Sequence, residues 1–144
     1  CESLAIARYI DDAFEGPKLI PADVKAAAVV NRWMACAATE IDQLLMRNYV
    51  VEYAFHKDEA GNVVRTKIDK ALKRFPKMFA TLEAAVADGF FGTAAFSMAD
   101  CFLLPILNAT NNFEEGKAAI AGAPNLSAYF TKMQERESFK ATAT

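Results

Sequence analysis

The chain has 144 residues and a formal net charge of -2, with 53% hydrophobic and 24% charged residues. This apolar content excludes a disordered chain, and the interspersed acids and bases leave no basic face for nucleic acid. The uncharged apolar runs are far shorter than the roughly 20 residues that span a bilayer, so we expect no membrane helix.

The first half of the chain shows helical periodicity twice. Ile6, Tyr9, Ile10 and Ala13 form one face of a short helix that ends before Gly16-Pro17, and residues 15–21 are predicted to be a linker. A long helix is predicted from about residue 22 to residue 55. Its apolar stripe recurs at alternating spacings of four and three, with one polar member: Val30, Met34, Ala37, Ile41, Leu44, Asn48, Val51 and Phe55.

The second half of the chain continues with helices. Residues 68–86 carry apolar side chains at the same spacing, and Pro76 inside this pattern predicts a kink. A further helix begins at Ser97 and contains Pro105, which predicts a second kink. A short helix precedes Pro124, which suits the first position of the next helix. No alternating run typical of a strand competes, so the sequence predicts an all-α bundle without a sheet.

Ser97 and Asp100 lie three residues apart at the start of an apolar run and could form either a catalytic pair or a helix cap. A capping box places a serine at the N-cap and an acidic side chain three residues later, so that each side chain satisfies the other's backbone N–H. A catalytic serine needs a positioned base, and the single histidine, His56, lies far away in a polar stretch where we expect a solvated loop residue. We therefore predict a structural capping box.

The chain contains three cysteines, Cys1, Cys36 and Cys101, an odd number without metal-like spacing. We expect reduced thiols in a cytoplasmic protein, and we expect no metal site. Cys36 and Cys101 fall on apolar helix faces, where they are predicted to be small core residues rather than reactive thiols. No signal peptide opens the chain, and we expect Cys1 to lie partway into a structural unit.

Three stretches share their order and motifs with a known family: "ESLAIARYIDDAF", "FSMADCFLLPIL" and "ERESFKAT". They resemble, respectively, the last helix of the thioredoxin-like N-terminal domain, the capping box with the central core helix, and the tail of a bacterial-type cytosolic glutathione transferase. The resemblance implies that residues 1–14 are the remnant last helix of an N-terminal domain that is mostly missing. It further implies that residues 15–21 are the linker and that residues 22–144 are the helical C-terminal domain.

The resemblance also implies an activity: conjugation of glutathione, as co-substrate, to small apolar electrophiles in detoxification. No catalytic residue is expected in this chain, because thiolate activation belongs to the missing domain. Glu2 and Ser3 match the family motif that holds the γ-glutamyl end of glutathione. A serine at a helix start offers a hydroxyl and free N–H groups to a carboxylate, although an ordinary capped helix has the same sequence. A homodimer is implied, without nucleic-acid or membrane partners.

The family's electrophile pocket is lined by the long helix and the C-terminal segment. Arg32, Trp33, Cys36 and Thr39 lie on or beside the face of that helix away from the main stripe, and they are our candidates for this pocket. Packing in the core or in a dimer is the alternative for each residue. The same choice applies to Tyr49 and Tyr53.

Two alternative functions remain open at this point. The same helical domain occurs as a non-catalytic interaction module attached to other proteins, where it mediates assembly. The fold also supports glutathione-dependent isomerisation, dehalogenation or ether cleavage. We expect this chain alone to be inactive and to bind glutathione weakly, because Glu2 and Ser3 reach one end of the tripeptide only.

Overall fold

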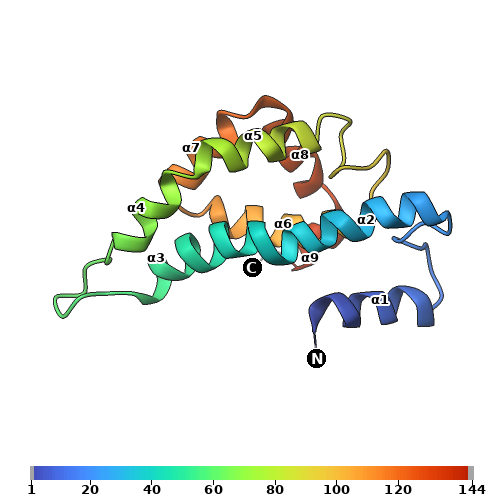
Figure 1. Ribbon diagram of the computed structural model, residues 1–144, viewed down its shortest axis with the longest axis horizontal. Helices are drawn as coiled ribbons and strands as arrows, with labels where there is room; N and C mark the ends of the chain where they lie inside the picture. The colour runs from blue at the N-terminus through green and yellow to red at the C-terminus, as the bar shows by residue number, and fades with distance from the viewer. Residues whose placement is uncertain (1, 143–144) are drawn as a thin grey trace.

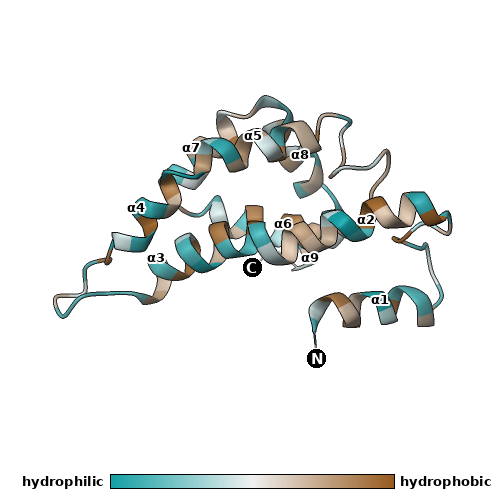
Figure 2. Ribbon diagram, in the orientation of Figure 1, coloured by the Kyte–Doolittle hydropathy of each residue, from teal (hydrophilic) through white to brown (hydrophobic). Residues whose placement is uncertain are grey.

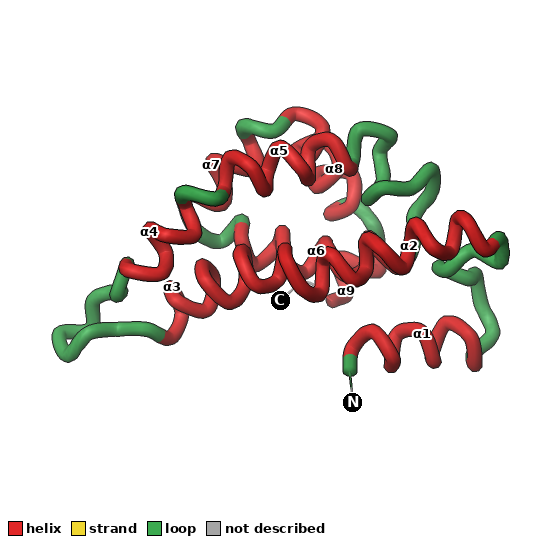
Figure 3. Tube along the Cα trace, in the orientation of Figure 1, coloured by secondary structure: helices red, strands yellow, loops and turns green. Residues whose placement is uncertain are grey.

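The computed structural model describes residues 2–142, and these form helices without a named strand. Figures 1 and 3 show their arrangement. The elements in chain order are α1 (Ser3–Ala13), α2 (Val24–Cys36), η1 (Ala37–Val50), α3 (Val51–Phe55), α4 (Thr66–Leu72), α5 (Phe75–Ala85), α6 (Met98–Thr110), α7 (Glu114–Ala121), α8 (Pro124–Gln134) and α9 (Glu137–Thr142). One isolated bridge pairs Lys57 with Val63 in the connection between α3 and α4. The all-α prediction is confirmed.

The core lies between one continuous rod and the helices packed on it. The rod comprises α2, η1 and α3, which follow one another without a break and form the predicted long helix. Helix α6 packs along α2 and η1, while α5, α7 and α8 contact one another on the other side of the core (Figure 1). The buried apolar side chains come from all of these layers, and the largest include Tyr49, Phe91, Leu103 and Tyr129.

The rod changes its helical period at η1, which is a π-helix. Its side-chain pairs are five residues apart: Gln43 donates to Asn48 at 3.2 Å and Arg47 to Asp42 at 2.9 Å. An α-helix would instead bring residues three or four apart together. The predicted apolar positions are therefore buried as far as Leu44, and beyond Leu44 the buried face shifts to other positions.

After Leu44 the buried positions are Leu45, Tyr49 and Glu52 rather than the predicted Asn48, Val51 and Phe55. Phe55 is 77% exposed. The wider π turn uses more residues per turn than the 3.6 of an α-helix, so the buried face advances along the sequence. The prediction of a single four-three stripe was wrong for this end of the rod.

Pro76, Pro105 and Pro124 occupy different positions in their helices. Pro76 does not kink a helix: α4 ends at Leu72, and Pro76 lies in the first turn of α5, where a proline leaves no backbone donor unpaired. Pro105 lies inside α6, and Pro124 begins α8 as predicted. The Glu83 carboxylate accepts the N–H groups of Asn125 and Leu126 at 2.9 and 2.8 Å, which caps α8 from α5.

Helix α1 is attached to the other helices in an unusual way. Its only buried residue is an acid, Asp11. Ile6, Tyr9 and Ile10 belong to the predicted apolar face, but they are exposed to solvent, Tyr9 by 67%. Figure 2 shows brown, hydrophobic segments along α1. Leu4 and Ala7 are only partly buried against the core. Apolar burial thus contributes little to holding α1 in place.

Candidate functional site

Ser97 and Asp100 form the predicted capping box at the start of α6. Asp100 is completely buried and accepts four hydrogen bonds: from the N–H of Phe91 (2.9 Å), the N–H of Ser97 (2.8 Å), the hydroxyl of Ser97 (3.2 Å) and the hydroxyl of Tyr129 (2.9 Å). His56 is elsewhere, with its Nδ1 2.6 Å from the carboxylate of Glu52. A buried serine without a base cannot act as a nucleophile, so this pair is structural.

Glu2 and Ser3 stand at the start of α1. Glu2 is the N-cap residue, with extended backbone angles and no side-chain cap, and its carbonyl accepts the N–H of Ile6 at 3.0 Å. Both side chains are exposed. Within residues 2–142 the Ser3 hydroxyl has no hydrogen-bond partner, so it is free to bind a ligand. Cys1 lies outside the described residues.

Asp11 links α1 to the linker and to α6. Its two carboxylate oxygens accept the N–H groups of Leu19 at 2.7 Å and Ile20 at 3.2 Å. The carbonyl of Leu19 in turn accepts the N–H of Met98, the first residue of α6, at 2.9 Å. The sequence pattern did not predict this contact, because an aspartate near a helix end is common and only the fold places the N–H groups of Leu19 and Ile20 beside it.

Of the four residues predicted for the electrophile pocket, the structure brings two together. Trp33 and Cys36 line a cavity of about 320 Å³ between the rod and the α4–α5 segment, together with Ile41, Leu44 and Met78. Lys73, Arg74 and Lys77 lie at its edge. Arg32 stacks on the Trp33 ring at 4.7 Å, and the Thr39 hydroxyl donates to the carbonyl of Ala35 at 2.8 Å; neither lines this cavity.

The Trp33 cavity and α1 lie on opposite sides of the rod. Asn31 faces α1, since its side chain accepts a hydrogen bond from Arg8 at 3.2 Å. Trp33 follows two residues later and is rotated by about 200° from Asn31 around the helix axis. Figure 1 shows the same arrangement, with α1 on one side of α2 and α5 on the other. That an electrophile binds in the Trp33 cavity stays a prediction.

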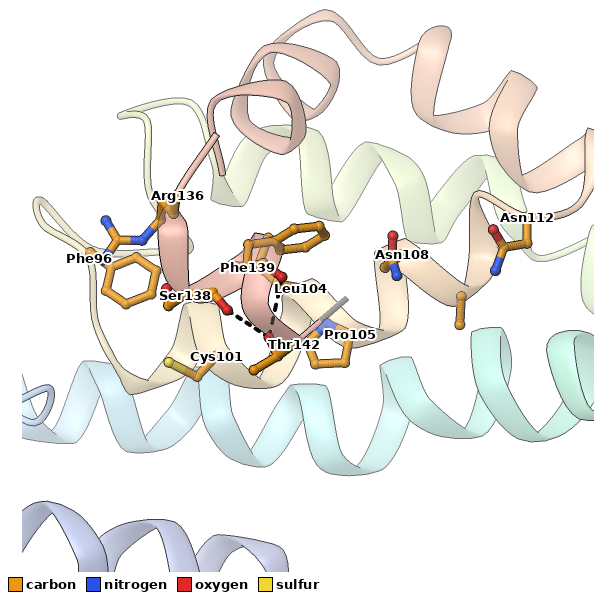
Figure 4. Close-up of a pocket in the computed structure, with 11 residues that line it drawn as sticks. Phe96, Cys101, Leu104, Pro105, Asn108, Asn112, Arg136, Ser138, Phe139 and Thr142 are labelled. Atoms are coloured by element: carbon orange, nitrogen blue, oxygen red, sulfur yellow. Dashed lines mark hydrogen bonds between the residues drawn. The ribbon is translucent and has the colours of Figure 1, made fainter. Parts of the chain in front are cut away.

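A second cavity, of about 420 Å³, lies between α6 and α9 (Figure 4). Cys101, Leu104 and Phe139 supply apolar surface, Asn108 supplies an amide, and Arg136 stacks on Phe96 with its guanidinium carbon 3.7 Å from the ring centre. Burial raises the pKa of the Cys101 thiol to about 11. This thiol is therefore protonated near neutral pH and is a poor nucleophile. Cys101 and Cys36 are both partly buried and pack against the core.

Tyr49 and Tyr53 belong to a polar network rather than to a ligand pocket. The Tyr53 hydroxyl donates to the Glu115 carboxylate at 2.7 Å, the Tyr49 hydroxyl donates to it at 3.1 Å, and Arg65 forms an ion pair with it at 2.8 Å. Burial opposes ionisation of Glu115, but the hydrogen bonds from Arg65 and the tyrosines outweigh it and lower the pKa of the carboxyl to about 2. Burial raises the pKa of both tyrosines. The network fixes α7 on the rod.

Two classes of site find no support in the described residues. None of the helices within residues 2–142 has the length and hydrophobicity needed to cross a membrane. The same part of the chain holds no group of three or more His, Cys, Asp or Glu side chains arranged to bind a metal ion.

A comparison of the sequence with protein-family models identifies the family of this chain. The family model described as "Glutathione S-transferase, C-terminal domain" matches residues 58–132, more than half of the chain. The chain belongs to this family. The match covers the capping box and the core helix α6, so the part of the glutathione S-transferase C-terminal domain identified by sequence is also the centre of the fold.

Solved glutathione transferases share the whole fold. A poplar enzyme, glutathione transferase F1, is 25% identical, with a TM-score of 0.85, and the similarity covers 98% of this chain and 66% of the poplar chain. A glutathione S-transferase from Methylobacillus flagellatus, solved with glutathione bound, is 24% identical, with a TM-score of 0.79 and coverage of 99% and 69%. A family member from Pseudomonas fluorescens, also with bound glutathione, is 23% identical, with a TM-score of 0.76 and coverage of 99% and 66%.

This chain spans about two thirds of the length of these relatives. No curated protein sequence matches it. The comparisons thus confirm the recognised family and the fold, and support glutathione as the co-substrate of that family.

Proposed function

We propose that this glutathione S-transferase C-terminal domain serves a protein that joins glutathione to a small apolar electrophile. In that reaction the glutathione sulfur forms a bond to an electrophilic carbon, and a leaving group departs with the electron pair of the broken bond. The residue that activates the thiol would come from a thioredoxin-like domain in the full-length protein. The observation that carries this proposal is the uncovered start of α1, where Ser3 and the first backbone N–H groups are free to bind a carboxylate.

In this proposal Ser3 and the helix N-terminus hold the γ-glutamyl carboxylate, and Glu2 pairs with the neighbouring ammonium group. Two observations support a role for α1 next to a further domain. Its apolar face, formed by Ile6, Tyr9 and Ile10, has no cover among the described residues. Its Glu2-Ser3 end is also exposed, so both features remain accessible to a sheet packed on that side.

The electrophile pocket is proposed separately from the glutathione anchor. Trp33 and Cys36 offer an apolar cavity, while Arg32 and Thr39 stay candidates only on the outer surface of the rod. Because the rod separates that cavity from α1, we expect the reacting carbon to be held on the α1 side, with the Trp33 cavity at most holding part of a larger substrate. We further propose a cytoplasmic homodimer that acts in detoxification.

The experiment that tests this function uses the full-length protein, glutathione and a small aromatic chloride as electrophile. We expect glutathione-dependent release of chloride, and Ser3→Ala should raise the KM for glutathione more than it lowers kcat. Ser138→Ala is the matched control, because Ser138 is also exposed and lies in the first turn of a helix. If calorimetry detects no glutathione binding by the full-length protein, the proposal is wrong and an interaction module becomes the better description.

A further inference from the structure

The carboxylate of Asp11 is the most directional contact between α1 and the helical body. Asp11 is 8% exposed and is the one buried residue of α1. Its oxygens accept two backbone N–H groups, from Leu19 and Ile20, which are adjacent in the chain. Hydrogen bonds are directional, whereas apolar contacts are not, so two of them on one carboxylate fix the angle of the helix that carries it.

The donor side of this contact, Leu19 and Ile20, is itself fixed to the core. The Leu19 carbonyl accepts the N–H of Met98, and the neighbouring Ser97 is capped by the buried Asp100. Ile20 belongs to the buried core. Asp11 therefore connects α1 to the start of the central helix α6 through one residue of linker rather than through a flexible surface loop.

The other contacts of α1 constrain it less. Arg8 reaches Asn31 at 3.2 Å, and Lys18 donates to carbonyl groups at the C-terminal end of α1, including that of Phe14 at 3.0 Å. The contacts to Asn31 and to the Phe14 carbonyl are exposed, whereas the contact of Lys18 with the Asp11 carbonyl is part-buried. All are made by long, flexible side chains, which hold an orientation weakly.

We infer that Asp11 is a positioning residue that sets the orientation of α1 and thereby places Glu2 and Ser3 for glutathione. This inference rests on the proposed function. Ser3 lies eight residues before Asp11, about 12 Å along the helix axis. A rotation of α1 by about 10° around Asp11 would move the Ser3 hydroxyl by about 2 Å, enough to break a hydrogen bond to a ligand.

The test compares Asp11→Asn with Asp12→Asn in the full-length protein. Asparagine keeps the shape of aspartate but offers one acceptor oxygen in place of two. Asp12 is the neighbouring exposed acid, and among residues 2–142 its carboxylate forms one ion pair, with Arg8 at 3.7 Å. Hydrogen exchange should accelerate at the amides of Leu19 and Ile20 in Asp11→Asn and stay unchanged in Asp12→Asn.

Kinetics then separate positioning from a general loss of structure. For Asp11→Asn we expect the KM for glutathione to rise about fivefold, the effect of weakening the binding by one ordinary hydrogen bond, while kcat at saturating glutathione and the KM for the electrophile stay within about twofold. Asp11→Ala should show a larger rise in the same constant. Asp12→Asn should match the wild type in the KM for glutathione, in the KM for the electrophile and in kcat.

Each outcome has one meaning. If the wild type binds glutathione and Asp11→Asn binds it equally well, the inference is wrong and the proposed function stands. A fall in kcat with an unchanged KM for glutathione would also overturn the inference. If the wild type binds no glutathione, the proposed function fails, and the assignment of Asp11 to a glutathione site fails with it.

Discussion

The Tyr129 hydroxyl of α8 donates to the buried Asp100 carboxylate of α6 at 2.9 Å, which joins the last long helix to the cap of the central one. Asp100→Ala removes the acceptor of four hydrogen bonds in a site without solvent. We expect it to lower the free energy of unfolding by about 3 kcal/mol or more, because buried donors lose their partner. Tyr129→Phe should lower it by about 1 kcal/mol.

Urea denaturation of both single variants and of the double variant measures this coupling. In the double variant the loss should be smaller than the sum of the two single losses, since the second substitution removes a donor already without an acceptor. Asp88→Ala, on an exposed acid, is the control. An Asp100→Ala protein as stable as the control would contradict the assigned role of this carboxylate.

Ser97→Ala is expected to lower the free energy of unfolding by about 1 kcal/mol, the typical effect of losing an N-cap side chain. The loss should be smaller than for Asp100→Ala, because the Asp100 carboxylate keeps the N–H groups of Ser97 and Phe91 in the Ser97 variant. Thermal unfolding followed by circular dichroism compares Ser97→Ala with Ser138→Ala. Equal midpoints for the two variants would rule out a cap at Ser97.

Glu115 should make stability depend on pH in the acid range. Its pKa in the folded protein, about 2, lies below the ordinary value of 4.5, so the folded state favours the ionised carboxylate. The stabilising contribution is therefore complete above about pH 5 and is lost as the pH falls from 4.5 towards 2. Glu115→Gln should be less stable than the wild type at pH 7, and the difference should shrink through that acid range.

Denaturant unfolding at a series of pH values from 7 to about 2 measures the Glu115 effect. Glu114→Gln, on the exposed neighbouring residue, controls for the change in net charge. A stability difference between wild type and Glu115→Gln that stays constant across the series would show that the Arg65 and tyrosine contacts do not favour the ionised form.

Gly92→Ala is expected to destabilise the fold by about 2–4 kcal/mol. Gly92 has a φ of +68°, and a Cβ at this position would collide with the indole ring of Trp33. Gly61→Ala is the matched comparison: its φ is +84°, but the space around its Cβ is open, so only backbone strain of about 1 kcal/mol applies. Thermal unfolding midpoints compare the stability of the two variants, and Trp33 fluorescence reports a change in the surroundings of the indole ring. Equal midpoints would show that the indole ring gives way.

Local patterns in the sequence predicted the parts of this fold that depend on near neighbours. The Ser97 capping box needs partners three residues away, and Pro124 needs only the helix start that it occupies, so both were predictable. The buried stripe from Val30 to Leu44 recurs at spacings of four and three and was also correct, although η1 begins at Ala37. Pro76 was placed in the right helical region, but the break before it depends on how α4 and α5 pack on the rod.

Contacts between distant residues could not be predicted in the same way. Tyr49 meets Glu115 across 66 residues, and Asp11 meets backbone groups whose direction is set by the linker. The candidate pocket residues show the same limit: spacing put Arg32, Trp33, Cys36 and Thr39 on neighbouring faces, and only packing against α5 decided which of them line the Trp33 cavity.

The π-helical turn of η1 affects how the gene can change length. In most surface connections, gaining or losing one codon shifts a loop and little else. Here Tyr49 and Glu52 reach their partners only because the wider turn takes up extra residues upstream. Unless the segment returned to α-helical spacing, deleting a single residue such as Arg47 would turn everything beyond it by about a quarter turn, which would swing Tyr49 away from Glu115 and Glu52 away from Lys67. We therefore expect length changes in this lineage to collect in the 56–65 connection and to avoid the rod.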